Sequence, residues 1–174
     1  MLAADVIFSS GGGQWGLDQA SMILGLKGLI GCEIHVTGAV RDLHSAMHVG
    51  GVANPIYALS LIISAIENRA GKIKIDGFYD DMINFTLQGR NEIAKVPFDE
   101  DDYRKSVGAT EAFEEMQYTI PESLSVSPKF ELNGIWGGYQ GKGTKTVLPL
   151  LASAKITCRL VADQEPEKIY KLLK

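Results

Sequence analysis

Three side chains of this sequence have a residue type and a setting that suit chemistry on a polar substrate. The first is His44, which lies in a polar loop directly after an alternating segment. Loops held by a rigid scaffold often present functional side chains. A histidine there can donate a hydrogen bond to the negative charge that develops on an oxyanion. Taken alone, a histidine of this kind is more often an ordinary exposed loop residue.

Arg159 and Thr146 are the other two candidates. Arg159 lies in an alternating segment, in the opposite phase to the apolar residues. Its guanidinium could bind a substrate carboxylate through two parallel hydrogen bonds. Thr146 follows a glycine-rich stretch and could offer a hydroxyl group. On composition alone, a surface salt bridge and a threonine that begins a strand are the commoner interpretations.

The sequence has no motif of a self-contained active site. Its three histidines are His35, His44 and His48, and none belongs to a His-x-Asp or His-Glu-x-x-His motif. Two-metal hydrolysis needs clustered carboxylates and histidines. There is also no phosphate-binding glycine–lysine loop, no Gly-x-Ser-x-Gly and no Cys-x-x-Cys. We therefore expect no metal site, no cofactor and no independent catalysis in this chain.

Composition narrows the class of protein further. The 174 residues carry a net charge of -4, which argues against a nucleic-acid partner because such a partner calls for a basic face. No apolar run approaches the roughly 20 residues of a membrane span, and the first residues lack the features of a signal peptide. Cys32 and Cys158 both lie in apolar alternations. We expect buried thiols and a cytoplasmic location.

Periodicity predicts the elements that must position these side chains. Cys32, Ile34 and Val36 alternate with polar residues and predict a strand over 29–37. Asn54 and Pro55 suit the start of a helix, which we expect to end at Gly71. Further strands are expected over 130–135 and 155–161, and a final helix from about residue 165.

The predicted fold is α+β, a ferredoxin-like two-layer sandwich with an antiparallel sheet and two helices on one face. A mainly helical insertion occupies residues 72–127, in which Asp99 precedes an acidic helix start. A fourth strand would complete the unit. Either residues 1–28 supply it, or the sheet keeps an open edge at which another chain can pair.

Eight stretches of the sequence, read in order, resemble one known pattern. They are residues 25–29, 36–38, 41–45, 50–51 with 54–55, 77–81, 133–139, 145–149 and 154–161. In this order they closely resemble the inserted domain of the dipeptidase branch of the zinc aminoacylase and carboxypeptidase family. That family includes carnosinases, acetylornithine deacetylase and succinyl-diaminopimelate desuccinylase. The resemblance covers the chain from about residue 4 to 174.

The resemblance implies a role for each candidate residue. In this family a catalytic domain binds two metal ions, usually zinc, and the smaller inserted domain forms the dimer and acts as a lid. The histidine matching His44 reaches into the partner subunit's active site and polarises the scissile carbonyl. The threonine matching Thr146 contributes to substrate binding across the dimer. The arginine matching Arg159 binds the substrate's terminal carboxylate within its own subunit.

The chain also departs from the family pattern. Aligned from Asp5, the position of a family aspartate ligand falls on Gly11, which cannot bind a metal. The upstream His-x-Asp segment and the downstream histidine are absent. We therefore expect residues 1–28 to be a junction with a missing catalytic domain, and residues 29–174 to be the lid and dimerisation domain. In the dimer, residues 54–69 and the neighbouring strand should lie near the interface.

Two hypotheses follow. The first is the lid and dimerisation domain of a dizinc enzyme that hydrolyses dipeptides or N-acyl amino acids, with its homodimer partner and its own catalytic domain as the expected partners. The second is a free-standing module that binds a small molecule or associates with itself. Metal-ligand motifs on both sides in the parent reading frame would favour the first.

Overall fold

A computed structural model describes residues 5–7, 18, 21–23, 25–83, 85–110 and 117–174. Most of the expected junction, including Gly11, lies outside these residues. The junction therefore remains a prediction.

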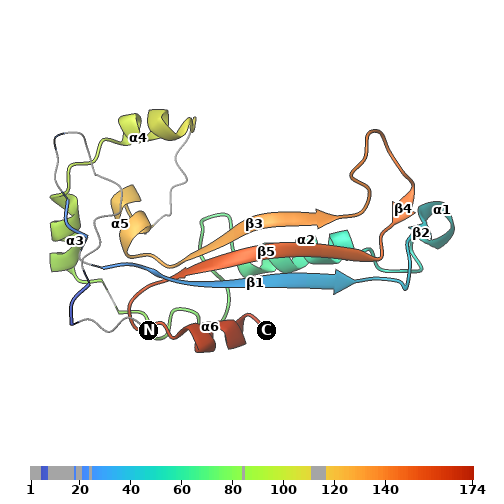
Figure 1. Cartoon of the computed structure of the whole chain (residues 1–174), viewed down its shortest axis with the longest axis horizontal. Helices are drawn as coiled ribbons and strands as arrows, with labels where there is room; N and C mark the ends of the chain where they lie inside the picture. Colours follow the sequence, from blue (N-terminus) through green and yellow to red (C-terminus); the bar gives the residue numbers. More distant parts are fainter. Residues whose placement is uncertain (1–4, 8–17, 19–20, 24, 84, 111–116) are drawn as a thin grey trace.

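The centre of the molecule is a long antiparallel sheet (Figure 1). Its strands are β1 (Gly28–Thr37), β3 (Lys129–Gly137) and β5 (Leu151–Leu160), in the order β1-β5-β3. β5 therefore pairs on both sides, with Arg159 opposite Leu29 on β1 and Lys129 on β3. The strand expected over 155–161 begins four residues earlier, because pairing with β1 continues to Leu151.

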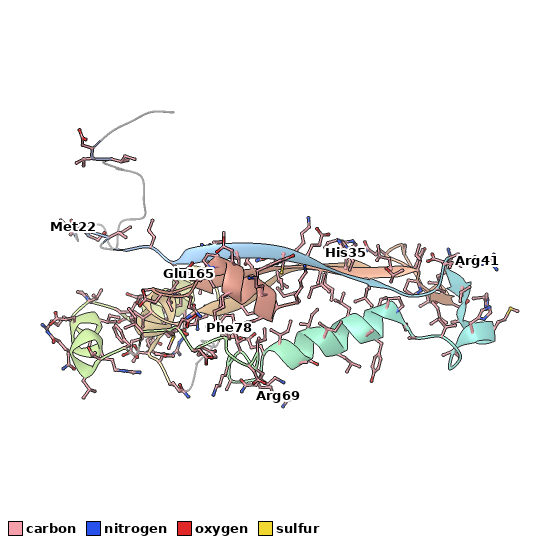
Figure 2. All side chains as sticks on the ribbon, turned by 90° about the horizontal axis from the view of Figure 1, so that it is seen from below. Met22, His35, Arg41, Arg69, Phe78 and Glu165 are labelled. Carbon is pink, nitrogen blue, oxygen red and sulfur yellow. The ribbon has the colours of Figure 1, made fainter. Side chains whose placement is uncertain are left out.

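One face of this sheet carries the core. Ile156, Cys158 and Leu160 are buried on it, as their alternation predicts. Helix α6 (Pro166–Leu172) covers one end of this face and packs Ile169 into the same cluster. Helix α2 (Pro55–Ile66) covers the other end with Leu59. Figure 2 shows both helices on the same side of the sheet, with His35 on the opposite side. An α+β sandwich with two helices on one face is thus confirmed.

Helix α2 begins where the sequence predicts and ends earlier. Asn54 caps it by accepting a hydrogen bond from Ile56 N at 2.9 Å. The expected end at Gly71 is wrong, because the helix stops at Ile66. The Asn68 side chain accepts hydrogen bonds from two later backbone N–H groups and closes a tight turn. That turn reverses the direction of the chain, and Glu67 forms an antiparallel β-bridge with Ile73. Residues of one continuous helix could not form this bridge.

The predicted insertion contains three short helices, α3 (Leu87–Ala94), α4 (Glu100–Val107) and α5 (Ile120–Ser125). Asp99 caps α4, and acidic residues fill its first turn as expected. A capping box joins Thr119 and Glu122 at the start of α5. The buried Glu122 also accepts hydrogen bonds from Arg90 of α3 at 3.1 and 3.2 Å, which ties α3 to α5.

The fourth strand of a ferredoxin-like unit is not found among the described residues. In these residues the three-stranded sheet ends at β1 on one side and at β3 on the other. The ferredoxin-like detail therefore remains a prediction. Among the helices that the structure describes, none combines the length and apolar character that crossing a membrane requires.

Candidate functional site

A small second sheet forms the far tip of the molecule (Figure 1). It pairs β2 (Leu43–His44) with β4 (Val147–Leu148), and the short helix α1 (Ser45–His48) follows β2. Periodicity cannot predict strands of two residues, because they exist only through pairing across about 100 residues of chain. The tip projects beyond the ends of the long strands β1 and β5.

Backbone contacts hold this tip in place. Gly38 N donates to Leu150 O at 2.7 Å, and Ser45 N donates to Thr146 O at 3.1 Å. Gly38 also has no room for a side chain, since a Cβ there would lie 2.6 Å from Pro55 Cγ. The tip is therefore attached to the start of α2 and to β5, and does not move as an independent loop.

Asp42 is the residue of the tip whose role the sequence did not reveal. Its Oδ1 accepts a hydrogen bond from Leu150 N at 2.8 Å, so it joins the entry of β2 to the exit of β4. An aspartate in a loop or turn often bonds to nearby backbone N–H groups. That local preference was a usable signal, but a partner 108 residues away was not predictable from it.

The tip brings His44 and Thr146 together. Thr146 Oγ1 lies 3.3 Å from His44 Nε2, and both side chains are exposed. His44 is also the N-cap residue of α1, yet its side chain makes no capping hydrogen bond. The imidazole is therefore directed toward Thr146 and solvent, where it could meet a polar ligand.

The segment that carries His44 also carries exposed apolar side chains. Val40, Met47 and Val49 are among the most exposed large apolar residues of the described chain. Apolar surface that gathers around polar groups is typical of a contact surface. The tip thus has the composition of a contact surface.

Arg159 lies at the opposite end of the molecule, near the end of β5. It is exposed, and no carboxylate of the described residues lies within ion-pair distance of its guanidinium. It lines a cavity of about 1430 Å³ between the insertion and the end of the sheet. A guanidinium that no described carboxylate pairs with, in a chain of net charge -4, is available for an anionic ligand.

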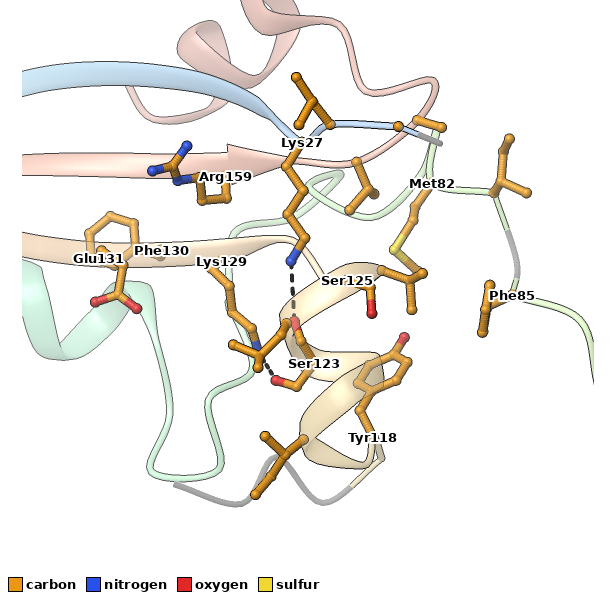
Figure 3. A pocket seen from close by; sticks show the side chains of 18 of the residues that line it. Lys27, Met82, Phe85, Tyr118, Ser123, Ser125, Lys129, Phe130, Glu131 and Arg159 are labelled. Carbon is orange, nitrogen blue, oxygen red and sulfur yellow. Dashed lines mark hydrogen bonds between the residues drawn. The ribbon is translucent and has the colours of Figure 1, made fainter. Parts of the chain in front are cut away.

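Figure 3 shows the polar groups that share this cavity. Lys27 Nζ donates to Ser123 O at 3.1 Å and to Ser127 O at 2.6 Å. Lys129 Nζ donates to Ser123 Oγ at 2.6 Å. These two ammonium groups fasten α5 to the sheet, whereas Arg159 makes no such contact within the described structure.

The structure separates Arg159 from the other two candidates. From Leu151 to Arg159 strand β5 spans about 27 Å, at roughly 3.4 Å per residue. β2 and β4 lie beyond the start of β5 (Figure 1). His44 is in β2, Thr146 directly precedes β4, and Arg159 is the next-to-last residue of β5. A ligand the size of a dipeptide cannot contact His44 and Arg159 of one copy at once.

The described residues do not offer the donor set of a metal centre. No group of three or more His, Cys, Asp or Glu side chains is placed among them to hold an ion. Nδ1 of His35 instead shares a hydrogen bond with Ser153 Oγ at 2.9 Å, and Nε2 of His35 lies 3.7 Å from Glu33 Oε1. Ser153 has no exposed surface, so this chain of polar groups supports the sheet and is not an accessible nucleophile.

The family of peptidase dimerisation domains matches residues 24–174. The chain is 28% identical over 158 residues to the Cys-Gly metallodipeptidase of Candida albicans, which covers 91% of this chain and 33% of that protein. It is 24% identical over 149 residues to the beta-Ala-His dipeptidase of Rattus norvegicus, covering 86% and 30%. It thus spans about a third of the length of these curated relatives.

Solved structures agree with this. An M20-family metallo-carboxypeptidase from Sulfolobus solfataricus superposes with a TM-score of 0.83 at 36% identity, over 92% of this chain and 42% of that one. A dipeptidase from Saccharomyces cerevisiae gives a TM-score of 0.75 at 25% identity, over 86% and 31%. The resemblance inferred from the eight sequence stretches is confirmed: the chain belongs to the family of peptidase dimerisation domains found in M20 metallopeptidases.

Proposed function

We propose that this chain is the lid and dimerisation domain of a dinuclear-zinc hydrolase that acts on dipeptides or N-acyl amino acids. The relatives named as dipeptidases and as a carboxypeptidase support this substrate class. Because the chain spans about a third of those dipeptidases, we place the catalytic domain and its metal ions in the remainder of a longer enzyme. We also place that enzyme in the cytoplasm, in keeping with the free thiols of Cys32 and Cys158.

The observation that carries the proposal is the distance between the tip, which holds His44 and Thr146, and the end of β5 that holds Arg159. A site that uses both His44 and Arg159 on one small substrate must take them from two copies of the chain. In the proposed enzyme, Arg159 of one subunit binds the substrate's terminal carboxylate. The tip of the other subunit enters the same cleft, where His44 donates a hydrogen bond to the developing oxyanion and Thr146 lies beside the substrate. The catalytic domain would hold the zinc ions, which would activate the attacking water when bound.

Helix α2 presents the surface on which the two copies would meet. Its outward side exposes Tyr57 and Leu61, at 67% and 53% of their possible surface, flanked by Ile56 and Ile62. The Ile56 side chain reaches Gly138, directly after β3. In the described chain the outer edge of β3 is unpaired. α2 itself packs against β5 and β1. Its exposed apolar side and the open edges of the sheet are together a suitable dimer interface.

Sedimentation equilibrium tests this surface. The chain should form a dimer at micromolar concentration, and Leu61→Lys should weaken it at least about tenfold, because two-fold symmetry places both introduced charges in one apolar interface. The matched control is Leu87→Lys, which changes a leucine on α3 that is more exposed than Leu61, at 80% of its possible surface, and should leave the dimer intact. A monomer at all micromolar concentrations would contradict the proposal.

A second measurement concerns activity. The purified chain should hydrolyse neither dipeptides nor N-acyl amino acids, since we place the catalytic metals elsewhere. Dipeptidase activity of this chain that a chelator abolishes would refute the assignment as an accessory domain.

A further inference from the structure

The contact between Thr146 and His44 determines which ring nitrogen of His44 is left for a ligand. Nε2 of His44 lies 3.3 Å from Thr146 Oγ1, and the described residues supply no partner for Nδ1. A neutral imidazole has one N–H group and one lone pair, and a threonine hydroxyl can donate or accept. Two arrangements are therefore possible, and they give the nitrogen left for a ligand opposite characters.

In the first arrangement the Thr146 hydroxyl donates to Nε2, and the ring proton is on Nδ1. In the second, Nε2–H donates to the hydroxyl, and Nδ1 has only a lone pair. Only the first leaves a neutral His44 with a ring N–H that no described residue uses and that is therefore left for a ligand. We infer that Thr146 is a positioning residue, which donates a hydrogen bond to Nε2 and so holds neutral His44 in its Nδ1–H tautomer. This inference rests on the function proposed above, in which His44 must donate to an oxyanion.

The backbone fixes the hydroxyl in the position that this role needs. Thr146 O accepts from Ser45 N, the residue after His44, and the next residue, Val147, pairs directly with His44. Asp42 closes the same unit by accepting from Leu150 N. Both partners of the hydrogen bond are thus carried by paired backbone. Threonine adds a stiff χ1 angle, because its Cβ is branched.

Substitution by valine or serine distinguishes this role of Thr146 from a purely structural one. Valine has the same shape without the hydroxyl and therefore cannot donate to Nε2. Serine keeps the hydroxyl but rotates more freely about χ1. If Thr146 served only to pack the tip, valine would replace it and serine would be the poorer substitute. If it sets the tautomer, serine retains the effect and valine loses it.

Nuclear magnetic resonance of the ¹⁵N-labelled chain measures the tautomer directly. Two-bond ¹H–¹⁵N correlations distinguish protonated from unprotonated ring nitrogens when the imidazoles are neutral, at about pH 8.5. His44 should have its proton mainly on Nδ1. Thr146→Val should shift the tautomer ratio by about two- to tenfold toward Nε2–H, the effect of one neutral hydrogen bond, and Thr146→Ser should retain most of the wild-type ratio.

His35 provides an internal control in the same spectra. Its Nδ1 lies 2.9 Å from Ser153 Oγ on the long sheet, so its tautomer should be unchanged in both variants. A wild-type His44 protonated mainly on Nε2 would overturn the inference, whatever the variants show. An unchanged ratio in Thr146→Val would overturn it as well. Sedimentation measures the dimer separately, so a failure of the proposed function is distinguishable from a failure of the tautomer inference.

Discussion

Arg159 and His44 differ in how the protein holds them. The His44 ring has Thr146 as a partner and sits on paired backbone. The Arg159 guanidinium has backbone support from β5 but no side-chain partner within the described chain. A free guanidinium can bind a carboxylate without first breaking an internal ion pair, which suits a group that recognises substrate.

Arg159→Gln in the proposed full-length enzyme should therefore affect binding more than turnover. The KM for a dipeptide with a free terminal carboxylate should rise about 10- to 100-fold, the effect of losing a charge-assisted hydrogen bond. The KM for the matching amidated peptide should hardly change. Lys155→Gln is the control, since Lys155 lies on the same strand and the same exposed face. Equal effects on the acid and the amide would contradict this role.

Cys158 gives a pH-dependent contribution to stability. Burial, together with the nearby Cys32, raises the pKa of Cys158 from 9.0 to about 12. The folded chain therefore keeps this proton between pH 9 and 12, while the unfolded chain loses it near pH 9. The contribution of the Cys158 thiol to the free energy of unfolding is fully present below pH 9 and is lost as the pH rises toward 12. Between pH 8 and 10 the free energy of unfolding should fall by about 1.4 kcal/mol.

Urea unfolding of the wild type and of Cys158→Ala at pH 7, 8, 9 and 10 measures this contribution. The variant lacks the thiol, so the difference in unfolding free energy between the two proteins should shrink above pH 8. A difference that stays constant to pH 10 would show that the thiol does not titrate as its burial requires.

The sequence could identify these residues singly but not the contacts between them. The resemblance named His44, Thr146 and Arg159. The pairing of His44 with Thr146 joins residues 102 positions apart, and no local pattern encodes such a contact. The separation of Arg159 from this pair results from the length of β5 and its place in the folded sheet, which could not be predicted from the sequence.

Elements with strong local signals were predictable from the sequence. The alternation in β1 and β5 gave the correct buried face, and Asn54 and Asp99 gave correct helix starts. The end of α2 was not predictable, because Asn68 closes its turn through side-chain hydrogen bonds. β2 and β4 are stabilised by the long-range pairing of two residues each, too few for any periodicity.

At the scale of elements, the Arg90–Glu122 pair should hold the insertion together. Glu122 is 5% exposed, so Arg90→Met leaves a buried carboxylate without its cation. This change should lower the unfolding free energy by about 2 kcal/mol. The same change in a Glu122→Gln background should cost less, because glutamine is neutral and can still complete the capping box with Thr119.

Lys95→Met is the matched control for this pair. Lys95 and Glu92 form an ion pair at 2.7 Å, but both side chains are mostly exposed. Its loss should change the unfolding free energy by less than about 0.5 kcal/mol. Equal costs for Arg90→Met and Lys95→Met in urea unfolding would mean that the buried pair does not stabilise α3 and α5.

At the scale of the whole molecule, the long sheet acts as a spacer. Its length keeps the tip about 27 Å or more from the Arg159 end, so in the proposed dimer each copy would contribute one end to each of two sites. Dimerisation would then be part of catalysis in the proposed enzyme, because a single subunit cannot supply both contacts. Weakening the α2 interface should lower activity in proportion to the loss of dimer.

Complementation between two inactive variants of the full-length enzyme tests this arrangement most directly. His44→Ala and Arg159→Ala should each be impaired about 100-fold or more as homodimers. In a mixed dimer, one site receives Arg159 from one subunit and His44 from the other, and is complete. Unfolding and refolding an equal mixture should therefore restore about one quarter of wild-type activity. If both residues act within one subunit, the mixture will stay as inactive as its parents, and the account of a shared site is wrong.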